Sequence, residues 1–414
     1  IVPGLEMVIE VDPEDRLDRT LGVRKRIPEV GRMAVDVRAM PPLHLTLVPL
    51  LHESEPDSSI VESVQAMAAD PDGHALLADM RTLLPITELA VTAHEPVTTS
   101  FQDPFRLISE IAAMRVMEGG SGYWMGVMQP PPRTGGTNFW YALPIGVAFA
   151  GGTASAAIRE PSVMAHELAH NLGLGHAPCG GPFNIDPWFP YPIGNTGAWG
   201  YDFAEKALVA PRTPDLMSYC WRHGYWVSDY HFNKALAHRL ANDGASAAAL
   251  TAAADPVRSL LVWGGRDADG VPYLDPAFVV EATPSLPTAG GEYTIEGRTA
   301  DGISILSFTF DMPVTADAEG EATSFVFALP VQAGWDDALA SITLSGPGGS
   351  ATLNQNTDRP MAILRDPQSG RVRGFLRDPP PPAQSGRDGA RVSRVGGLEV
   401  IRSRGLPNAA AWQR

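Results

Sequence analysis

The chain has 414 residues, of which 44% are hydrophobic and 19% are charged, and this size and composition suit two globular domains better than one. The net charge of −16 argues against nucleic acid as a partner, because phosphate binding requires basic patches, and it is typical of a secreted or cell-surface protein. No apolar run approaches the roughly 18 residues of a membrane span, so none is expected. The first residues are neither a start methionine nor a signal peptide, and we expect a processed or truncated piece of a longer precursor.

Residues 1–40 carry no recognisable chemistry. A strand is predicted at residues 5–11, then a charged stretch punctuated by prolines, and then a short extended piece at residues 35–37. We expect an N-terminal extension, either the tail of an upstream domain or part of a propeptide.

Strands and helices alternate from Leu43 onward. A buried strand is predicted up to residue 51, followed by helices at 58–70 and 74–83 and by a strand at 89–92. A helix that opens at Asp103 and Pro104 has apolar residues near the helical period, and further strands are predicted at 123–128 and 145–149. This order predicts an α/β layer with the active site along its edge.

The most informative motif is the run His-Glu-Leu-Ala-His-Asn-Leu-Gly-Leu-Gly-His at residues 166–176. On a helix, His166 and His170 are one turn apart and can bind one metal ion, while Glu167 can reach a water on that metal. Gly173 can end the helix, so that the chain doubles back and brings His176 as a third ligand. Three histidines leave one position of a tetrahedral zinc open, as catalytic sites require. An amphipathic helix with solvated histidines leaves Gly173 and His176 unexplained.

The chain has two cysteines, and both lie close in sequence to the candidate site. Cys179 follows His176 by three residues, and Cys220 follows Met217 by three. A disulfide between these segments is the preferred interpretation and implies an oxidising compartment. Two unpaired core cysteines are the main alternative, and an inhibitory zinc ligand is a weaker one.

Residues 177–215 form a long segment rich in glycine, proline and aromatic residues. Its side chains could line a substrate wall or pack beneath the loop, and the candidates are Trp188, Phe189, Tyr191 and Trp199. A helix is expected from Asp229 to about residue 242, with Ser228 as its N-cap. Three further histidines are predicted to be surface or capping residues: His223, His231 and His238.

The sequence changes character after an alanine-rich linker at residues 244–255. Short strands separated by turn residues predict an all-β sandwich over residues 255–378. A tail rich in arginine, glycine and serine, residues 379–414, is expected to be largely disordered.

The eleven-residue motif resembles that of the metzincin clan of zinc endopeptidases, in particular bacterial secreted proteases of reprolysin-like or mucin-degrading type. Met217, downstream of the third histidine, matches the clan's Met-turn, in which the methionine packs under the zinc without binding it. The resemblance implies that Tyr219 binds zinc at rest or stabilises the tetrahedral intermediate; a buried, hydrogen-bonded tyrosine is the alternative. It also implies that residues 141–150 form an edge strand that pairs with extended substrate, although an ordinary core strand fits the sequence as well.

Together these features predict a metzincin-like α/β (α+β) catalytic domain at residues 41–245, followed by the β-sandwich. The predicted activity is that of a secreted or cell-surface zinc endopeptidase acting on proteins or glycoproteins. His166, His170 and His176 would hold the zinc, and Glu167 would be the general base. Two alternatives remain, an adhesion or binding protein with a vestigial zinc site and a zinc hydrolase that acts on something other than a peptide.

Overall fold

The computed structural model describes residues 4–130, 145–221, 224–249, 255–287, 290–318, 322–379 and 393–412. The chain divides into two compact units, residues 1–41 and 42–414. In the first unit, β1 (Glu6–Met7) pairs with β4 (Met33–Ala34), and β2 (Ile9–Glu10) pairs with β3 (Arg26–Ile27). The 3-10 turn η1 (Arg19–Leu21) lies between β2 and β3 in the chain. The strand predicted at residues 5–11 is therefore interrupted at Val8.

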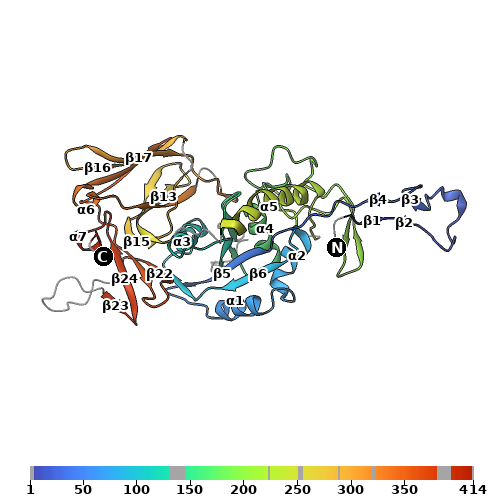
Figure 1. Cartoon of the computed structure of the whole chain (residues 1–414), viewed down its shortest axis with the longest axis horizontal. Coiled ribbons are helices and arrows are strands. Elements are labelled where there is room, and N and C mark those ends of the chain that lie inside the picture. Colours follow the sequence, from blue (N-terminus) through green and yellow to red (C-terminus); the bar gives the residue numbers. More distant parts are fainter. Residues whose placement is uncertain are drawn as a thin grey trace, which may run out of the picture. The chain divides into compact units, whose positions relative to one another are not determined.

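The second unit is built on a ten-stranded sheet (Figure 1). The sheet order is β23 (Ser393–Val395), β24 (Leu398–Ser403), β21 (Met361–Arg365), β22 (Val372–Arg377), β7 (Val97–Thr99), β5 (Leu43–His52), β8 (Tyr123–Met128), β10 (Ala154–Ile158) and β9 (Gly146–Ala148), with β6 (Leu89–Ala93) also paired to β5. Strands β5, β8 and β10 run parallel, and β9 is antiparallel to β10. Strands β8 and β10 are almost wholly apolar and fully buried, as expected for strands covered on both faces. β9 ends the sheet on the side of the helix that carries His166 and His170.

Helices cover this sheet and complete its core. They are α1 (Ser59–Ala69), α2 (Ala78–Leu83) after the short η2 (Ala75–Leu77), α3 (Pro104–Met117), α4 (Pro161–Asn171) and α5 (Asp229–Ala249). The Asp103 carboxylate caps α3 by accepting a hydrogen bond from Phe105 N–H at 3.0 Å, with Pro104 in the first turn. The helices predicted near residues 58–70, 74–83, 104–116 and 229–242 are thus present. In the described part of the chain, no helix has the length and apolarity that crossing a membrane requires.

Two smaller sheets lie C-terminal to α5. One contains β13 (Val257–Arg266), β14 (Pro272–Leu274), β15 (Phe278–Ala282) and β18 (Thr323–Pro330), and the other contains β16 (Tyr293–Arg298), β17 (Ser304–Phe310), β19 (Ser341–Gly346) and β20 (Gly349–Asn354). Leu260 and Val262 on β13 share a buried core with Ile295 of the other sheet, as in a β-sandwich. Their neighbours Leu261 and Trp263 face the opposite way and join the core of the main sheet. Helix α3 contacts both β10 and β18, so it lies between the two regions (Figure 1).

Two expectations for the C-terminal region are wrong. Strands β21 and β22 were expected in the sandwich, yet they extend the main sheet, with Gly374 of β22 in register with Thr98 of the parallel β7. The tail was expected to be disordered, but β23, β24 and α7 (Ala409–Trp412) are formed within residues 393–412. Pairing with β21 stabilises β24, which composition alone does not reveal. Residues 380–392 and 413–414 of the expected tail lie outside the described residues. The small helix α6 (Trp335–Ala338) precedes β19.

Candidate metal centre

Residues 161–176, which carry the three histidines, form a helix, a glycine stop and a chain reversal. Helix α4 begins at Pro161 and ends at Asn171, and Gly173 follows with a φ of 81°, a left-handed conformation that favours glycine. Gly173 N–H donates to His170 O at 2.9 Å and Leu174 N–H donates to Ala169 O at 3.1 Å, which satisfies the last carbonyls of the helix. The chain then turns back, and His176 reaches the face that carries His166 and His170.

The three imidazoles converge on one point. Nε2 of His166 and Nε2 of His170 are 3.0 Å apart, and each lies 3.2 Å from Nε2 of His176. Ligand atoms placed 2.0–2.1 Å from a tetrahedral zinc would be about 3.3 Å from one another. The three nitrogens therefore have close to the spacing that such an ion requires.

The opposite nitrogen of each ring fixes its orientation. Nδ1 of His166 lies 3.0 Å from Leu216 O, and Nδ1 of His170 lies 2.8 Å from Leu174 O. Nδ1 of His176 lies 2.5 Å from Phe183 O. Because a carbonyl can only accept, each Nδ1 carries the proton and each Nε2 presents a lone pair to the centre. Three lone pairs aimed at one point in a buried site fit a cation, and so the residues fit the metal that the motif predicts.

Glu167 lies beside this group and is 2% exposed. Burial raises the pKa of Glu167 well above its usual value, and the negative charge of Asp317 raises it further. Its carboxylate packs against Gly146 of β9, where a Cβ atom would overlap the carboxylate oxygen. The glycine at this position of the edge strand thus makes room for the candidate base.

The segment that carries Met217 lies next to the histidines, and Met217 itself is fully buried. Met217 O accepts a hydrogen bond from Ala177 N–H at 2.8 Å, and Cys179 O accepts one from Tyr219 N–H at 2.8 Å. A disulfide joins Cys179 to Cys220, with Cα atoms 5.7 Å apart, as predicted. The loop that brings in the third histidine is therefore attached to the methionine turn by two backbone hydrogen bonds and one covalent bond.

A buried carboxylate holds this turn against α5. Asp215 is fully buried and accepts hydrogen bonds from Met217 N–H at 2.8 Å, Ser228 N–H at 2.8 Å and His231 Nδ1 at 2.9 Å. Burial by itself would raise the pKa of Asp215, but its pairing with His231 and the hydrogen bonds hold it below its usual value. His231 was predicted to be a surface or capping histidine; it is instead fully buried, and its Nδ1 donates to Asp215. Ser228 caps α5 as predicted, since its hydroxyl accepts from His231 N–H at 3.1 Å.

Tyr219 directs its hydroxyl group into the site. The hydroxyl donates to Oδ1 of Asp317 at 2.5 Å, and the ring centroid is 5.1 Å from that of His176. Burial, Asp317 and Glu167 all raise the pKa of Tyr219, so the hydroxyl stays protonated. The side chain is partly exposed, and its placement is compatible with the predicted role at the metal.

Asp317 is the residue that sequence reasoning missed. It lies between β17 and β18, far along the chain from the motif, and its carboxylate forms a metal-competent group with the three histidines. Its Oδ1 is 3.0 Å from Nε2 of His176, and its Oδ2 is 3.3 Å from Nε2 of His170. Burial by itself would raise the pKa of Asp317, but the imidazoles hold it well below its usual value. Burial lowers the pKa of His170 to about 4, while Asp317 acts in the opposite direction.

The aromatic residues between His176 and Asp215 were predicted either to line a substrate wall or to pack beneath the loop. Two of them pack inside, and two are exposed. Phe189 packs on His231, with ring centroids 4.7 Å apart, and Tyr191 donates to Asp229 at 2.6 Å. Trp188 and Trp199 are instead exposed, at 80% and 67%. The segment also forms a hairpin of β11 (Gly200–Asp202) and β12 (Ala207–Val209).

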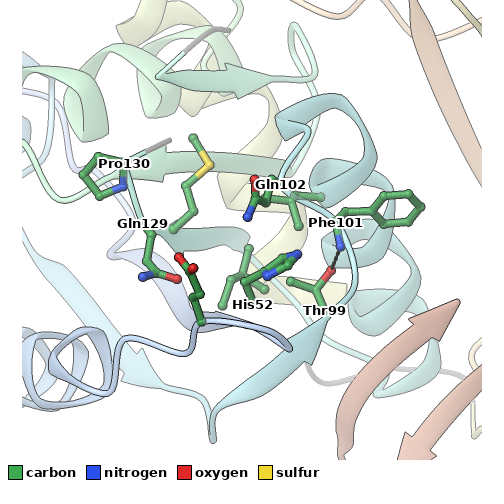
Figure 2. A pocket seen from close by; sticks show the side chains of 10 residues that line it. His52, Thr99, Phe101, Gln102, Gln129 and Pro130 are labelled. Atoms are coloured by element: carbon green, nitrogen blue, oxygen red, sulfur yellow. Dashed lines mark hydrogen bonds between the residues drawn. The ribbon is translucent and has the colours of Figure 1, made fainter. Parts of the chain in front are cut away.

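Two cavities elsewhere in the second unit are separate from the histidines. One, of about 230 Å³, lies at the carboxyl ends of β5 and β8, and Figure 2 shows His52, Gln102 and Gln129 around it. The other, of about 260 Å³, is lined by residues that include His44, Arg115 and Asp243. None of the residues that line them belongs to the metal-competent group.

Comparison with known families agrees with this geometry. The family model Peptidase M66, a metallopeptidase family, matches residues 141–232. The matched stretch contains the three histidines, Glu167 and Tyr219 but not Asp317. The match supports a peptidase, and the buried group of histidines and aspartate indicates a metal ion. No curated protein matches the chain.

Proposed function

We propose that the chain is a secreted, zinc-dependent endopeptidase of metzincin type that cuts peptide bonds in protein or glycoprotein substrates. The observation that carries the proposal is the convergence of three Nε2 lone pairs, each fixed by a carbonyl behind the ring, next to a buried glutamate. The disulfide between Cys179 and Cys220 favours an oxidising compartment and therefore export.

His166, His170 and His176 would hold the zinc, which when bound supplies a Lewis acid that activates water and polarises the scissile carbonyl. Glu167 accepts the proton of the attacking water and passes it to the leaving amine. Its raised pKa suits this exchange, because a carboxylate with a pKa nearer to neutrality both takes and returns a proton readily. Tyr219 donates its hydroxyl proton in a hydrogen bond to the oxyanion that develops on the substrate.

Substrate would bind as an extended strand along β9. This strand is the last of the main sheet, and on the side away from β10 the chain at Ala148–Ala150 pairs with residues next to Asp317 of the metal-competent group. Pairing with a strand edge holds a peptide by its main chain and leaves side-chain selection to the surroundings. The prediction for residues 141–150 stays a proposal for residues 145–150; residues 141–144 lie outside the described residues.

The test is a substitution of the proposed base. Glu167→Gln keeps the shape of the side chain and should retain one zinc per chain, while cleavage of unstructured casein falls by at least about a thousandfold, since the reaction loses its proton acceptor. Glu160→Gln, an exposed glutamate at the start of the same helix, is the matched control and should keep wild-type activity. Undiminished, chelator-sensitive cleavage by Glu167→Gln would reject the assignment.

A further inference from the structure

A segment of the chain itself lies where substrate is proposed to bind. Thr315 forms an antiparallel bridge with Phe149, directly after β9. Ala316 N–H donates to Ala148 O at 2.9 Å, and Ala150 N–H donates to Val314 O at 2.8 Å. Residues 313–318, here called the covering segment, thus continue the sheet by one short strand beyond its edge.

The covering segment ends at the metal-competent group. Asp317 is 9% exposed, and its Oδ1 lies 3.0, 3.6 and 2.5 Å from Nε2 of His176, Nε2 of His166 and the Tyr219 hydroxyl. The separations from the two imidazole nitrogens bracket the spacing of about 3.3 Å between neighbouring ligands of a tetrahedral zinc. A carboxylate oxygen is itself a regular zinc ligand.

We propose that Asp317 is the fourth metal ligand of a closed, resting form of the enzyme, in which the covering segment occupies the place of the substrate strand. This inference rests on the proposed function, because a closed form has meaning only if the site cleaves peptides. It assigns a ligand that lies outside the eleven-residue motif and outside the matched family region.

The closed form and substrate binding exclude each other on two grounds. Ala150 has a single N–H, and it is already donated to Val314 O, so an incoming peptide cannot use it. The oxygen of Asp317 fills the position that the attacking water needs beside Glu167. The covering segment must therefore leave both the β9 edge and the metal before the reaction can begin.

Hydrogen bonds are the main interactions that hold the covering segment in place, and Thr323 Oγ1 donates one of them to Pro313 O. Besides the two bonds to the β9 edge, Asn184 Nδ2 donates to Thr315 O at 3.2 Å, and Thr315 Oγ1 donates to Thr323 Oγ1 at 3.2 Å. Asp317 has a φ of 40°, a left-handed conformation that non-glycine residues seldom adopt. Residues 315–318 are buried but belong to neither apolar core, so hydrogen bonds and the proposed metal ligand hold the segment, and its departure breaks no apolar core.

The experiment uses the full, zinc-loaded chain and acetohydroxamate, a small chelating ligand that needs an accessible zinc but no strand pairing. Asp317→Ala should bind acetohydroxamate at least about tenfold more tightly than wild type, which is the gain expected if the closed form holds nine-tenths of the molecules. Ala316→Pro, which removes the N–H donated to Ala148 O, should change the affinity in the same direction while it keeps the carboxylate. Asp301→Ala, an exposed aspartate in the turn between β16 and β17, is the control and should not differ from wild type.

Zinc content and casein cleavage are measured on the same samples. Equal acetohydroxamate affinity in wild type and Asp317→Ala at equal zinc content would overturn the closed form, and so would a loss of cleavage in Asp317→Ala. If the alanine variant does not retain zinc, Asp317→Asn takes its place with the same criteria. If the closed form is correct but the proposed peptidase function is wrong, the result is different. Wild type and Asp317→Ala would then both bind zinc and differ in acetohydroxamate affinity, but neither would cut casein.

Discussion

The Asp215 carboxylate offers a sharp test of what holds the metal centre together. Asp215→Ala removes the acceptor of three buried donors, the N–H groups of Met217 and Ser228 and Nδ1 of His231. Each buried donor left without an acceptor costs at least about 1 kcal/mol, so the three together cost about 3 kcal/mol. Removing one partner of a buried pair costs about 3–5 kcal/mol. The free energy of unfolding should therefore fall by about 3–5 kcal/mol.

Urea unfolding followed by tryptophan fluorescence measures this loss. Asp366→Ala is the matched control, because Asp366 also accepts hydrogen bonds from two backbone N–H groups, those of Gln368 and Ser369, but is only partly buried. The control should lose clearly less stability. A loss below about 1 kcal/mol for Asp215→Ala would show that water or a neighbour replaces the carboxylate, and the reasoning from buried donors would be refuted.

Lowering the pH should reduce the difference in the free energy of unfolding between wild type and Asp215→Ala. Because the pKa of Asp215 is lower in the folded protein than in the unfolded chain, its contribution is complete above about pH 4, the ordinary value for aspartate, and is lost as the pH falls through the lower folded value. The two unfolding curves should converge below pH 4. A difference that grows on acidification would contradict the assigned direction.

Three further predictions concern other parts of the second unit. Gly146→Ala should displace Glu167 and lower kcat by about a hundredfold at unchanged zinc content, as judged by casein cleavage; wild-type kcat would contradict the overlap. Burial raises the pKa of Glu110, so keeping this side chain ionised lowers the stability of the folded protein increasingly as the pH rises above about 4.5. Glu110→Gln should therefore raise the melting temperature more at pH 8 than at pH 4.5. An equal increase at both pH values would contradict this prediction. Replacing Cys179 and Cys220 together by serine opens a loop of 41 residues and should lower the free energy of unfolding in urea by about 4 kcal/mol. An unchanged urea midpoint would contradict this prediction.

The local parts of the site could be predicted from the sequence because they depend on neighbouring residues. Helical spacing places His166 beside His170, and one left-handed glycine turns the chain toward His176. The two cysteines lie beside the two segments that they join, so their pairing was also predictable.

The parts that the sequence did not reveal depend on contacts between distant residues. Asp317 lies 141 residues after His176, and no spacing rule connects a turn between two sandwich strands to a helix. His231 carries no sign of burial until the methionine turn supplies Asp215 as its partner. Strand β22 has ordinary β-strand composition, and only its parallel register with β7 shows that it belongs to the main sheet and not to the sandwich.

The position of β22 also determines the order in which the protein can assemble during synthesis. β22 lies beside β7, near the middle of the sheet order, but ends only at residue 377 of 414. A ribosome-bound chain that has passed the histidines therefore still has an incomplete sheet, with the edge of β7 unpaired. By the time β22 emerges and closes it, Asp317 has already been made. Synthesis from the N-terminus thus supplies the Asp317 carboxylate before the sheet beside the three histidines is finished.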